Sequence, residues 1–546
     1  MPWNQAYNPS GHWLVSTLLA GLPVFVLLGT LAFLKLKAHW AALLGLASAL
    51  LVALVVFGMP AGKGAAVTLY GAAYGLFPIG WIILNVIFLY TLAEAKGYFR
   101  ILRESLAGVT RDRRLQLLLI AFSFGAFFEG AAGFGTPVAV SAAILIGLGF
   151  SPLAASGLSL IANTAPVAFG ALGTPIIALA GVTGLDVRAL SAMVARQLPI
   201  FSIIIPFWLV WVYAGRRGMR EVWPALLVAG VSFAVPQYLL ATFHGPWLAG
   251  VGAAVVSIGA LIGFLRVWKP RRIWLGGKGE KWEEPAENPK AAVPAATNAA
   301  PRAQIIRAWI PWLILSVLVF LWGVPAIKKI LDGISLLNIS VPGVDKLVFR
   351  VPPVVLSAAP EAAVFSLNGL SATGTSIFAA ALVSAAVMGC SGKELGRAWW
   401  KTLKRVRFSL LTVSAMMAIG FVARYAGLDA TMGLAFARTG VLYPFFGTML
   451  GWLGVALTGS DTSSNVLFGS LQKITAGQLG LSPTLMAAAN SSGGVMGKMI
   501  DAQSIVVAST ATKWYGKEGE ILRYVFFHSL ALAGLMGLLV MLEAYL

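Results

Sequence analysis

The chain alternates between long apolar runs and short polar or basic segments. Apolar runs cover residues 38–62, 64–93, 221–265 and 521–546, and a helix that spans a bilayer needs about 20 such residues. The runs are continuous rather than alternating, which argues against transmembrane strands. The pattern therefore predicts an all-α polytopic membrane protein with roughly 12–14 transmembrane segments.

Charged residues are nearly absent from residues 115–185, where Glu129 is the one charge in 71 residues. Glycines and Pro137 follow it closely, and both residue types interrupt regular helix. Broken backbone at membrane depth is tolerated only where protein or a water-filled cavity covers it. A buried ionisable group likewise needs a cavity or a partner. This stretch therefore predicts a polar site inside the membrane.

The second half of the chain repeats an order of motifs found in the first. Each half has an acid in a break rich in small residues, then a Leu-Gly-x-Ser-Pro motif, then an Asn followed by Thr or Ser: Glu129, 148–152 and Asn163-Thr164 in the first half, Asp461, 479–483 and Asn490-Ser491 in the second. The acid and the Asn are 34 residues apart in the first half and 29 in the second. Interrupted segments at matching places in two halves are the best sequence pointer to a transporter binding site.

This repeat predicts two membrane halves, residues 1–268 and 305–546, joined by a flexible cytoplasmic linker at 269–304 that is rich in Ala, Pro and Asn. Broken helices or re-entrant hairpins are expected near residues 129–137, 163–175, 458–465 and 490–498. The helix before Glu129 leaves a basic loop, whereas the helix before Asp461 leaves the opposite side. We therefore expect inverted repeats, as alternating access around a midplane site requires.

The net charge of +20 changes the picture only through its placement. Basic residues cluster in short loops between apolar runs, and no folded basic domain is expected, so nucleic acid is not an expected partner. We assign the basic segments to the cytoplasm: 35–37, 94–114, 216–220, 266–307 and 393–407. Counting crossings back places the N-terminus outside. It lacks a basic n-region, so we expect the first span to be retained rather than cleaved.

The polar breaks contain residue types that bind a small anion. Unwound helix ends expose backbone N–H groups, and helix N-termini add partial positive charge. Side-chain donors lie beside these ends: Asn163, Thr164, Asn490, Ser491, Ser492, Ser463 and Ser464. Lys498 and Arg196 are candidate cations for a carboxylate, with Asp501 and Asp461 as alternative partners of Lys498. Small polar residues can also serve helix–helix packing, and a cation near a helix end can reach the interface.

Glu129 and Asp461 are candidate proton carriers, because burial favours the neutral form of a carboxyl group. Co-transport of a proton avoids moving net negative charge against the membrane potential. Sodium held by carbonyl, Asn and Ser oxygens is the alternative use of the same groups. The four histidines lie away from the breaks and Cys390 is the sole cysteine, so we expect no metal site and no cofactor. An intramembrane enzyme would need a nucleophile with a base, and a channel would need a carbonyl filter or charged ring; the sequence shows neither pattern.

Several long motifs resemble the bacterial L-lactate permease family. They are residues 3–9, 128–135, 160–170, 457–465 and 493–500, and the resemblance covers nearly the whole chain. It implies proton-coupled uptake of L-lactate, D-lactate and glycolate across the bacterial inner membrane. It also implies kinship with the ion-transporter superfamily, whose members bind carboxylates at Asn-Ser/Thr motifs in hairpin tips; Asn163-Thr164 and Asn490-Ser491 look like such motifs.

Together these observations predict a secondary carrier for small 2-hydroxymonocarboxylates, with the lipid bilayer and the carboxylate substrate as its partners. A sodium-coupled mono- or dicarboxylate carrier of the same architecture is the alternative. Oligomeric state, proton stoichiometry and the kind of domain motion stay open at this point.

Overall fold

The computed structural model describes residues 2–32, 34, 36–131, 133, 136–276, 282–283, 301–515 and 517–546. Within these ranges, eleven helices are long and apolar enough to cross a membrane, and one bent helix pair gives a twelfth span. The predicted class, a helical polytopic membrane protein, is confirmed. Twelve spans is the lower end of the predicted number because several broken helices are too short to cross alone, such as Pro137–Gly147.

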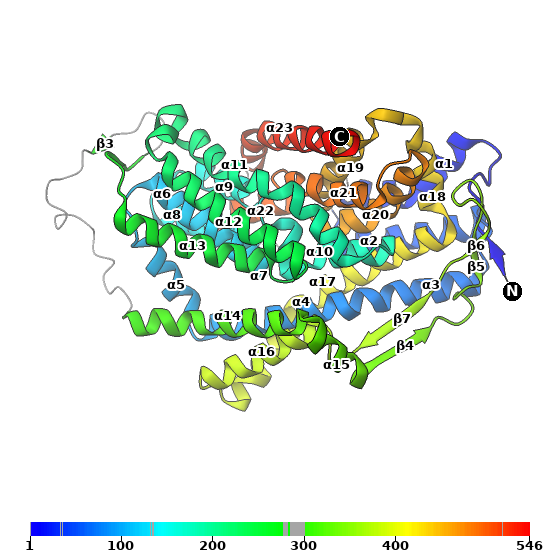
Figure 1. The fold of residues 1–546 in the computed structure, drawn as a ribbon, viewed down its shortest axis with the longest axis horizontal. Coiled ribbons are helices and arrows are strands. Elements are labelled where there is room, and N and C mark those ends of the chain that lie inside the picture. The colour runs from blue at the N-terminus through cyan, green and yellow to red at the C-terminus, as the bar shows by residue number, and fades with distance from the viewer. Residues whose placement is uncertain are drawn as a thin grey trace.

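One layer of the molecule consists of long helices from both sequence halves (Figure 1). In it α17 packs against α2, α3 and α4, and α16 packs against α4 and α14. The two halves of the sequence therefore interleave in space. The bounds in this layer are α1 (Trp13–Ala32), α2 (Ala38–Leu51), α3 (Ala61–Tyr74), α4 (Trp81–Ala95), α5 (Tyr98–Ala107), α14 (Arg302–Gly323), α15 (Pro325–Ser335), α16 (Thr373–Val387) and α17 (Gly392–Ala426).

The other layer holds the broken segments and the helices around them. Two helical hairpins contribute, which we name hairpin 1 (residues 113–147) and hairpin 2 (residues 443–478). Each is followed by a helix broken near its middle. The bounds are α6 (Arg113–Leu117), α7 (Gly125–Ala131), α8 (Thr136–Gly147), α9 (Pro152–Ala162), α10 (Gly170–Thr183), α19 (Tyr443–Thr458), α20 (Asp461–Gln478), α21 (Pro483–Gly497) and α22 (Ala502–Ala511). Helices around them are α11 (Val187–Glu221), α12 (Trp223–Phe243), α13 (Ala249–Val267), α18 (Leu428–Phe436) and α23 (Glu518–Tyr545).

The repeated Leu-Gly-x-Ser-Pro motif has the same local structure in both halves. Gly149 and Gly480 have φ of 88° and 67°, a left-handed conformation that glycine adopts without steric cost and that ends a helix. Ser151 and Ser482 then cap α9 and α21, and a proline occupies the first turn of each. The cap satisfies an amide at the helix start, and proline has no N–H to leave unpaired there.

The two hairpins enter the molecule from opposite ends. The base of hairpin 1 lies beside strand β2 (Ile273–Trp274), because Arg114 donates a hydrogen bond to the carbonyl of Arg272 (2.8 Å). The base of hairpin 2 lies beside strand β5 (Val348–Arg350), because Gln478 donates to the carbonyl of Pro353 (3.0 Å). In Figure 1 the strand β3 and the N-terminus mark these two ends. This is the geometry expected of inverted repeats.

A small β region caps the end that carries the N-terminus, and the sequence analysis missed it. Strand β1 (Trp3–Asn4) pairs in parallel with β5, which pairs with β6 (Ala359–Pro360). Strands β4 (Leu336–Ser340) and β7 (Val364–Asn368) form an antiparallel hairpin. Residues 336–368, expected within the C-terminal membrane half, therefore lie outside it. Short strands surrounded by strongly apolar helices gave too weak an alternating pattern to be recognised.

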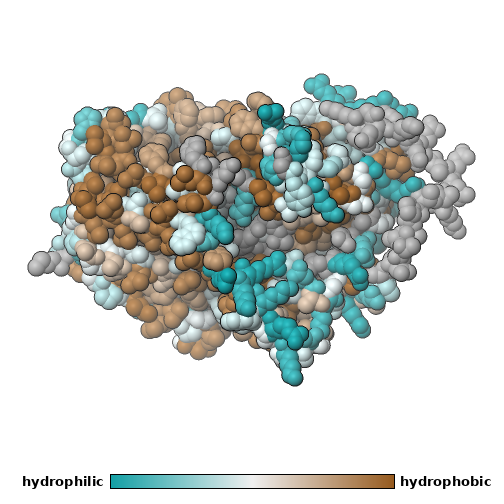
Figure 2. Space-filling model, turned by 180° about the vertical axis from the view of Figure 1, so that it is seen from behind, coloured by the Kyte–Doolittle hydropathy of each residue, from teal (hydrophilic) through white to brown (hydrophobic). Residues whose placement is uncertain are grey.

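The predicted flexible linker is ordered at its start. Strand β2 pairs with β3 (Trp282–Glu283), and Trp274 is buried against Arg114. Residues 277–281 and 284–300 lie outside the described residues. Figure 2 shows broad hydrophobic areas over the face turned away from the viewer in Figure 1, as expected of a surface that contacts lipid acyl chains.

Candidate functional site

Glu129 ends the first arm of hairpin 1 and packs into the break between α9 and α10. Its side chain is buried, and Asn163 Nδ2 donates a hydrogen bond to its Oε2 at 3.1 Å. A Cβ atom at Gly170 would lie 2.5 Å from Glu129 Oε1, so only glycine leaves room for the acid there. The break thus holds an acid, the amide that binds it and the glycine that accommodates it.

Asp461 occupies the matching place in the second repeat. It is buried at the first position of α20, and Ser491 Oγ donates a hydrogen bond to its Oδ2 at 2.5 Å. Asn465 Nδ2 donates to the same oxygen at 3.4 Å. A Cβ atom at Gly494 would lie 2.5 Å from Asp461 Oδ1. Both repeats therefore place an acid against a glycine and beneath a polar residue of the following broken helix.

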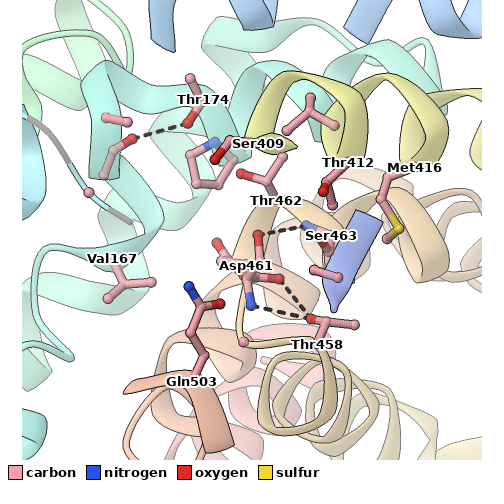
Figure 3. A pocket seen from close by; sticks show the side chains of 18 of the residues that line it. Val167, Thr174, Ser409, Thr412, Met416, Thr458, Asp461, Thr462, Ser463 and Gln503 are labelled. Carbon is pink, nitrogen blue, oxygen red and sulfur yellow. Dashed lines mark hydrogen bonds between the residues drawn. The ribbon is translucent and has the colours of Figure 1, made fainter. Parts of the chain in front are cut away.

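The two breaks meet at a shared cavity of about 960 Å³, counted with its opening to solvent. This is within the usual size of a small-molecule site. In Figure 3 Val167 and Thr174 of the first repeat lie on one side, with Asp461, Thr462 and Ser463 of the second repeat toward the other. The cavity is lined by Glu129, Gly133, Val167, Gly170, Ala171, Thr174, Pro175, Thr458, Gly459, Ser460, Asp461, Thr462, Ser463, Lys498 and Gln503, together with Leu27, Ala38, Ser409, Thr412, Val413 and Met416.

Helix N-termini point partial positive charge toward this cavity. Ser460 caps α20 by accepting from the amide of Ser463 (3.2 Å), and Asp501 caps α22 by accepting from the amide of Ser504 (2.7 Å). The start of α10 also lines the cavity, and there Ala171 and Leu172 have φ of 42° and 55°. Left-handed backbone at non-glycine residues is strained and concentrates at functional sites.

Lys498 lines the cavity but has protein partners. Its Nζ donates to the carbonyl of Gly459 (2.6 Å) and forms an ion pair with Asp501 Oδ2 (3.3 Å). Of the partners that the sequence left open, the structure selects Asp501. Among the described residues, no ion pair involves Glu129 or Asp461. Both acids therefore face the cavity region without a cation paired to them in that part of the chain.

Most of the predicted donors lie behind the cavity wall rather than on it. Ser463 lines the cavity. Asn163 and Ser491 instead hold the two acids, and Asn490 bonds to Asn465 (3.0 Å) and to Gln472 (3.1 Å). Three further candidates are buried but absent from the lining: Thr164, Ser464, which donates to the carbonyl of Gly451 (3.1 Å), and Ser492. The Asn-Ser/Thr motifs therefore position the acids.

Arg196 does not belong to the site. Its side chain is exposed on α11 and it is not among the lining residues, while the neighbouring Gln197 donates to Glu543 of α23 (2.7 Å). The expectation that Arg196 binds the substrate carboxylate is therefore corrected. Its position near Pro199 drew attention, but Pro199 lies inside a continuous helix and marks no break.

The sequence analysis missed the contribution of α17. Ser409, Val413 and Met416 follow one another at helical spacing on the face toward the cavity, with Thr412 beside them. The available signal was a pair of hydroxyl residues in an otherwise apolar part of α17. Gln503, in the first turn of α22, and Thr458, Ser460 and Thr462 around Asp461 also line the cavity without having been singled out.

Comparison with known proteins agrees with this geometry. The L-lactate permease family matches residues 16–546. The chain is 46% identical over 549 residues to glycolate permease GlcA of Escherichia coli (strain K12), covering 100% of this chain and 98% of that protein. It is 45% identical over 557 residues to L-lactate permease of Bacillus subtilis (strain 168), with the same shares covered. The solved YdaH transporter of Alcanivorax borkumensis is 16% identical over 87% of this chain and 86% of its own, with a TM-score of 0.42.

A family match that runs almost from end to end, relatives well above a third identical, and a cavity enclosed by broken membrane helices lead to one conclusion. The chain belongs to the L-lactate permease family and is a multi-pass membrane transporter.

Proposed function

We propose that the protein imports L-lactate and related small 2-hydroxymonocarboxylates, D-lactate and glycolate among them, by proton symport with alternating access. The observation that carries the proposal is the meeting of Glu129 and Asp461 at one cavity enclosed by the two breaks. Support for the substrate class comes from the relatives, one named a glycolate permease and others L-lactate permeases.

The charges around the cavity favour a coupled proton. Lys498 is paired with Asp501, so a bound carboxylate would lie near two further acids, Glu129 and Asp461. Like charges in a partly desolvated site repel strongly. Protonation of one acid removes this repulsion, and the reverse step releases the proton with the substrate. Proton coupling therefore follows from the presence of more acids than cations.

The substrate carboxylate has a favourable place at the start of α20. Backbone N–H groups in the first turn of a helix, together with the helix dipole, bind anions well. Thr462 and Ser463 line the cavity in this same turn and add hydroxyl donors. The start of α10 faces the same space from the other repeat. In this arrangement the carboxylate needs no free cationic side chain.

Alternating access in this fold would move the broken helices against the layer of long helices. The cavity lies between the two breaks and α17, and α17 packs against α2, α3 and α4. The basic segments argue that the end with β2 and β3 faces the cytoplasm and the end with the N-terminus faces the periplasm. The bacterial inner membrane is the proposed location.

Sodium coupling is the alternative. Asn465 and the carbonyls near the breaks are suitable sodium ligands, and the same architecture could carry mono- or dicarboxylates. The rival uses predict different dependence on the driving ion, so they can be separated directly.

The test uses purified full-length protein in liposomes with an imposed pH gradient, acidic outside, and labelled L-lactate. We expect accumulation that a protonophore abolishes and that is the same in sodium-free and sodium-containing buffer. Accumulation that requires sodium, at any pH gradient, would replace the proposed mechanism with the alternative. Liposomes without protein, and protein with succinate in place of lactate, serve as controls for leak and substrate class.

A further inference from the structure

The hydroxyl groups that line the cavity fall into two classes. Thr412 donates to the carbonyl of Phe408 (2.7 Å), and Thr458 donates to the carbonyl of Gly454 (2.7 Å), so both are engaged with their own helices. Among the described residues, the hydroxyls of Ser409, Thr462 and Ser463 have no hydrogen-bond partner. A site that must bind polar substrate atoms needs such uncommitted groups.

These three free hydroxyls lie on two different elements. Thr462 and Ser463 belong to the first turn of α20, where free backbone N–H groups and the helix dipole accompany them. Ser409 lies in the middle of α17, about one third of the way from either end being farther than a helix turn. Backbone amides in a helix interior are already bonded within the helix. Ser409 therefore offers the cavity a neutral hydroxyl and no positive end.

The neighbours of Ser409 on α17 are apolar. Val413 and Met416 lie four and seven residues further along and line the same cavity, which places all three on one helix face. Helix α17 packs directly against α20. A small molecule between the two helices would thus meet an anion-binding helix end on one side and, on the other, one hydroxyl with an apolar surface beside it.

We infer that Ser409 is a specificity-determining residue that hydrogen-bonds the 2-hydroxyl group of the substrate. The carboxylate faces the first turn of α20, the 2-hydroxyl reaches across to Ser409, and the methyl group of lactate contacts Val413 and Met416. This inference rests on the proposed function and deepens it. It names the group that distinguishes a 2-hydroxy acid from a plain monocarboxylate such as propionate.

A hydroxyl is well suited to this task. The serine hydroxyl can both donate and accept, so it can pair with the substrate 2-hydroxyl in either direction. A site that hydrogen-bonds a substrate hydroxyl selects against an analogue that lacks it, because the protein group is then left with a poorer partner. The apolar neighbours add contact area for the methyl group and do not discriminate between lactate and propionate.

The test compares the wild type with Ser409→Ala in liposomes, measuring KM for labelled L-lactate and the inhibition constant of propionate. We expect the KM for lactate to rise about three- to tenfold, the value of one neutral hydrogen bond. The inhibition constant of propionate should stay within about twofold, since propionate makes no such bond. Ser409→Thr, which keeps the hydroxyl, should restore much of the preference for lactate.

Ser414→Ala is the matched control on the same helix. Ser414 is absent from the lining of the cavity and donates to the carbonyl of Ala72 (3.0 Å), so its loss should leave the ratio of the two constants unchanged. Equal changes for lactate and propionate in Ser409→Ala, or an unchanged ratio, would overturn the assignment of Ser409. A wild type that takes up no lactate at all would instead overturn the proposed function.

Discussion

Asn163 donates a hydrogen bond to Glu129 at 3.1 Å, although the two residues are on different helices and 34 positions apart. Ser491 does the same for Asp461 at 2.5 Å in the second repeat, across 30 positions. Each repeat therefore contains an acid held by a polar side chain of the next broken helix. The paired motifs of the sequence are explained by this contact, which fixes where each acid lies relative to the cavity.

Glu129→Gln should abolish proton-driven accumulation. The amide has nearly the same size and can still accept from Asn163, but it carries no proton. With an imposed gradient of one pH unit, one coupled proton can concentrate a substrate about tenfold, and this concentration should disappear while exchange of internal for external lactate continues. Glu543→Gln, on α23 and bonded to Gln197, is the control and should accumulate lactate as the wild type does. Normal accumulation by Glu129→Gln would remove Glu129 from the coupling mechanism.

Ser491→Ala should impair the protein more than Ser492→Ala. The Ser491 hydroxyl bonds to Asp461, and a hydrogen bond to a charged group contributes about 1.5–3 kcal/mol. The Ser492 hydroxyl is buried without a hydrogen-bond partner among the described residues, so its removal should change little. Melting temperature and uptake under a pH gradient would measure the difference. Equal effects at both positions would show that the contact with Asp461 has no special weight.

Lys498→Met should destabilise the protein, and Asp501→Asn in the same chain should reverse most of the loss. Removing one partner of a buried ion pair leaves an uncompensated charge and costs about 3–5 kcal/mol, whereas replacing both is often neutral. If the substrate carboxylate binds at the start of α20, the double variant should also keep its KM for lactate within about threefold. Thermal unfolding and uptake kinetics check both points. A stable double variant with greatly raised KM would make Lys498 a direct ligand of the substrate.

Glu361 should give the β cap a pH-dependent stability. It lies just after β6 and forms ion pairs with Arg350 (2.5 Å) and Arg424 (3.3 Å). Burial alone would raise the pKa of Glu361, but Arg424 and Arg350 lower it below its usual value. A lowered folded pKa means that the stabilisation is present above the unfolded pKa of about 4.5 and is lost as pH falls through the folded pKa.

The measurement for Glu361 is the melting temperature of the wild type and of Glu361→Gln between neutral pH and pH about 3.5. The variant should be less stable at neutral pH, because two buried cations lose their partner, and the difference should shrink on acidification. A constant difference over the whole range would contradict the role of the ion pairs.

Hydropathy and break motifs were sufficient to predict the membrane class, the interrupted segments and their inverted arrangement. They succeeded because a span needs a fixed length of apolar residues and because glycine and proline interrupt helices locally. The acids Glu129 and Asp461 were found for the same reason, since an ionisable residue in an apolar run is conspicuous in one dimension.

Only the tertiary structure decided which groups face the cavity. Asn163 and Ser491 lie behind the acids, Lys498 pairs with Asp501, and Arg196 lies on the outside of α11, although all four looked equally suitable in sequence. Ser409 reaches the cavity from a helix more than two hundred residues away from the first break. Local sequence sets where a helix breaks, but the side of a wall on which a residue lies depends on how distant helices pack against it.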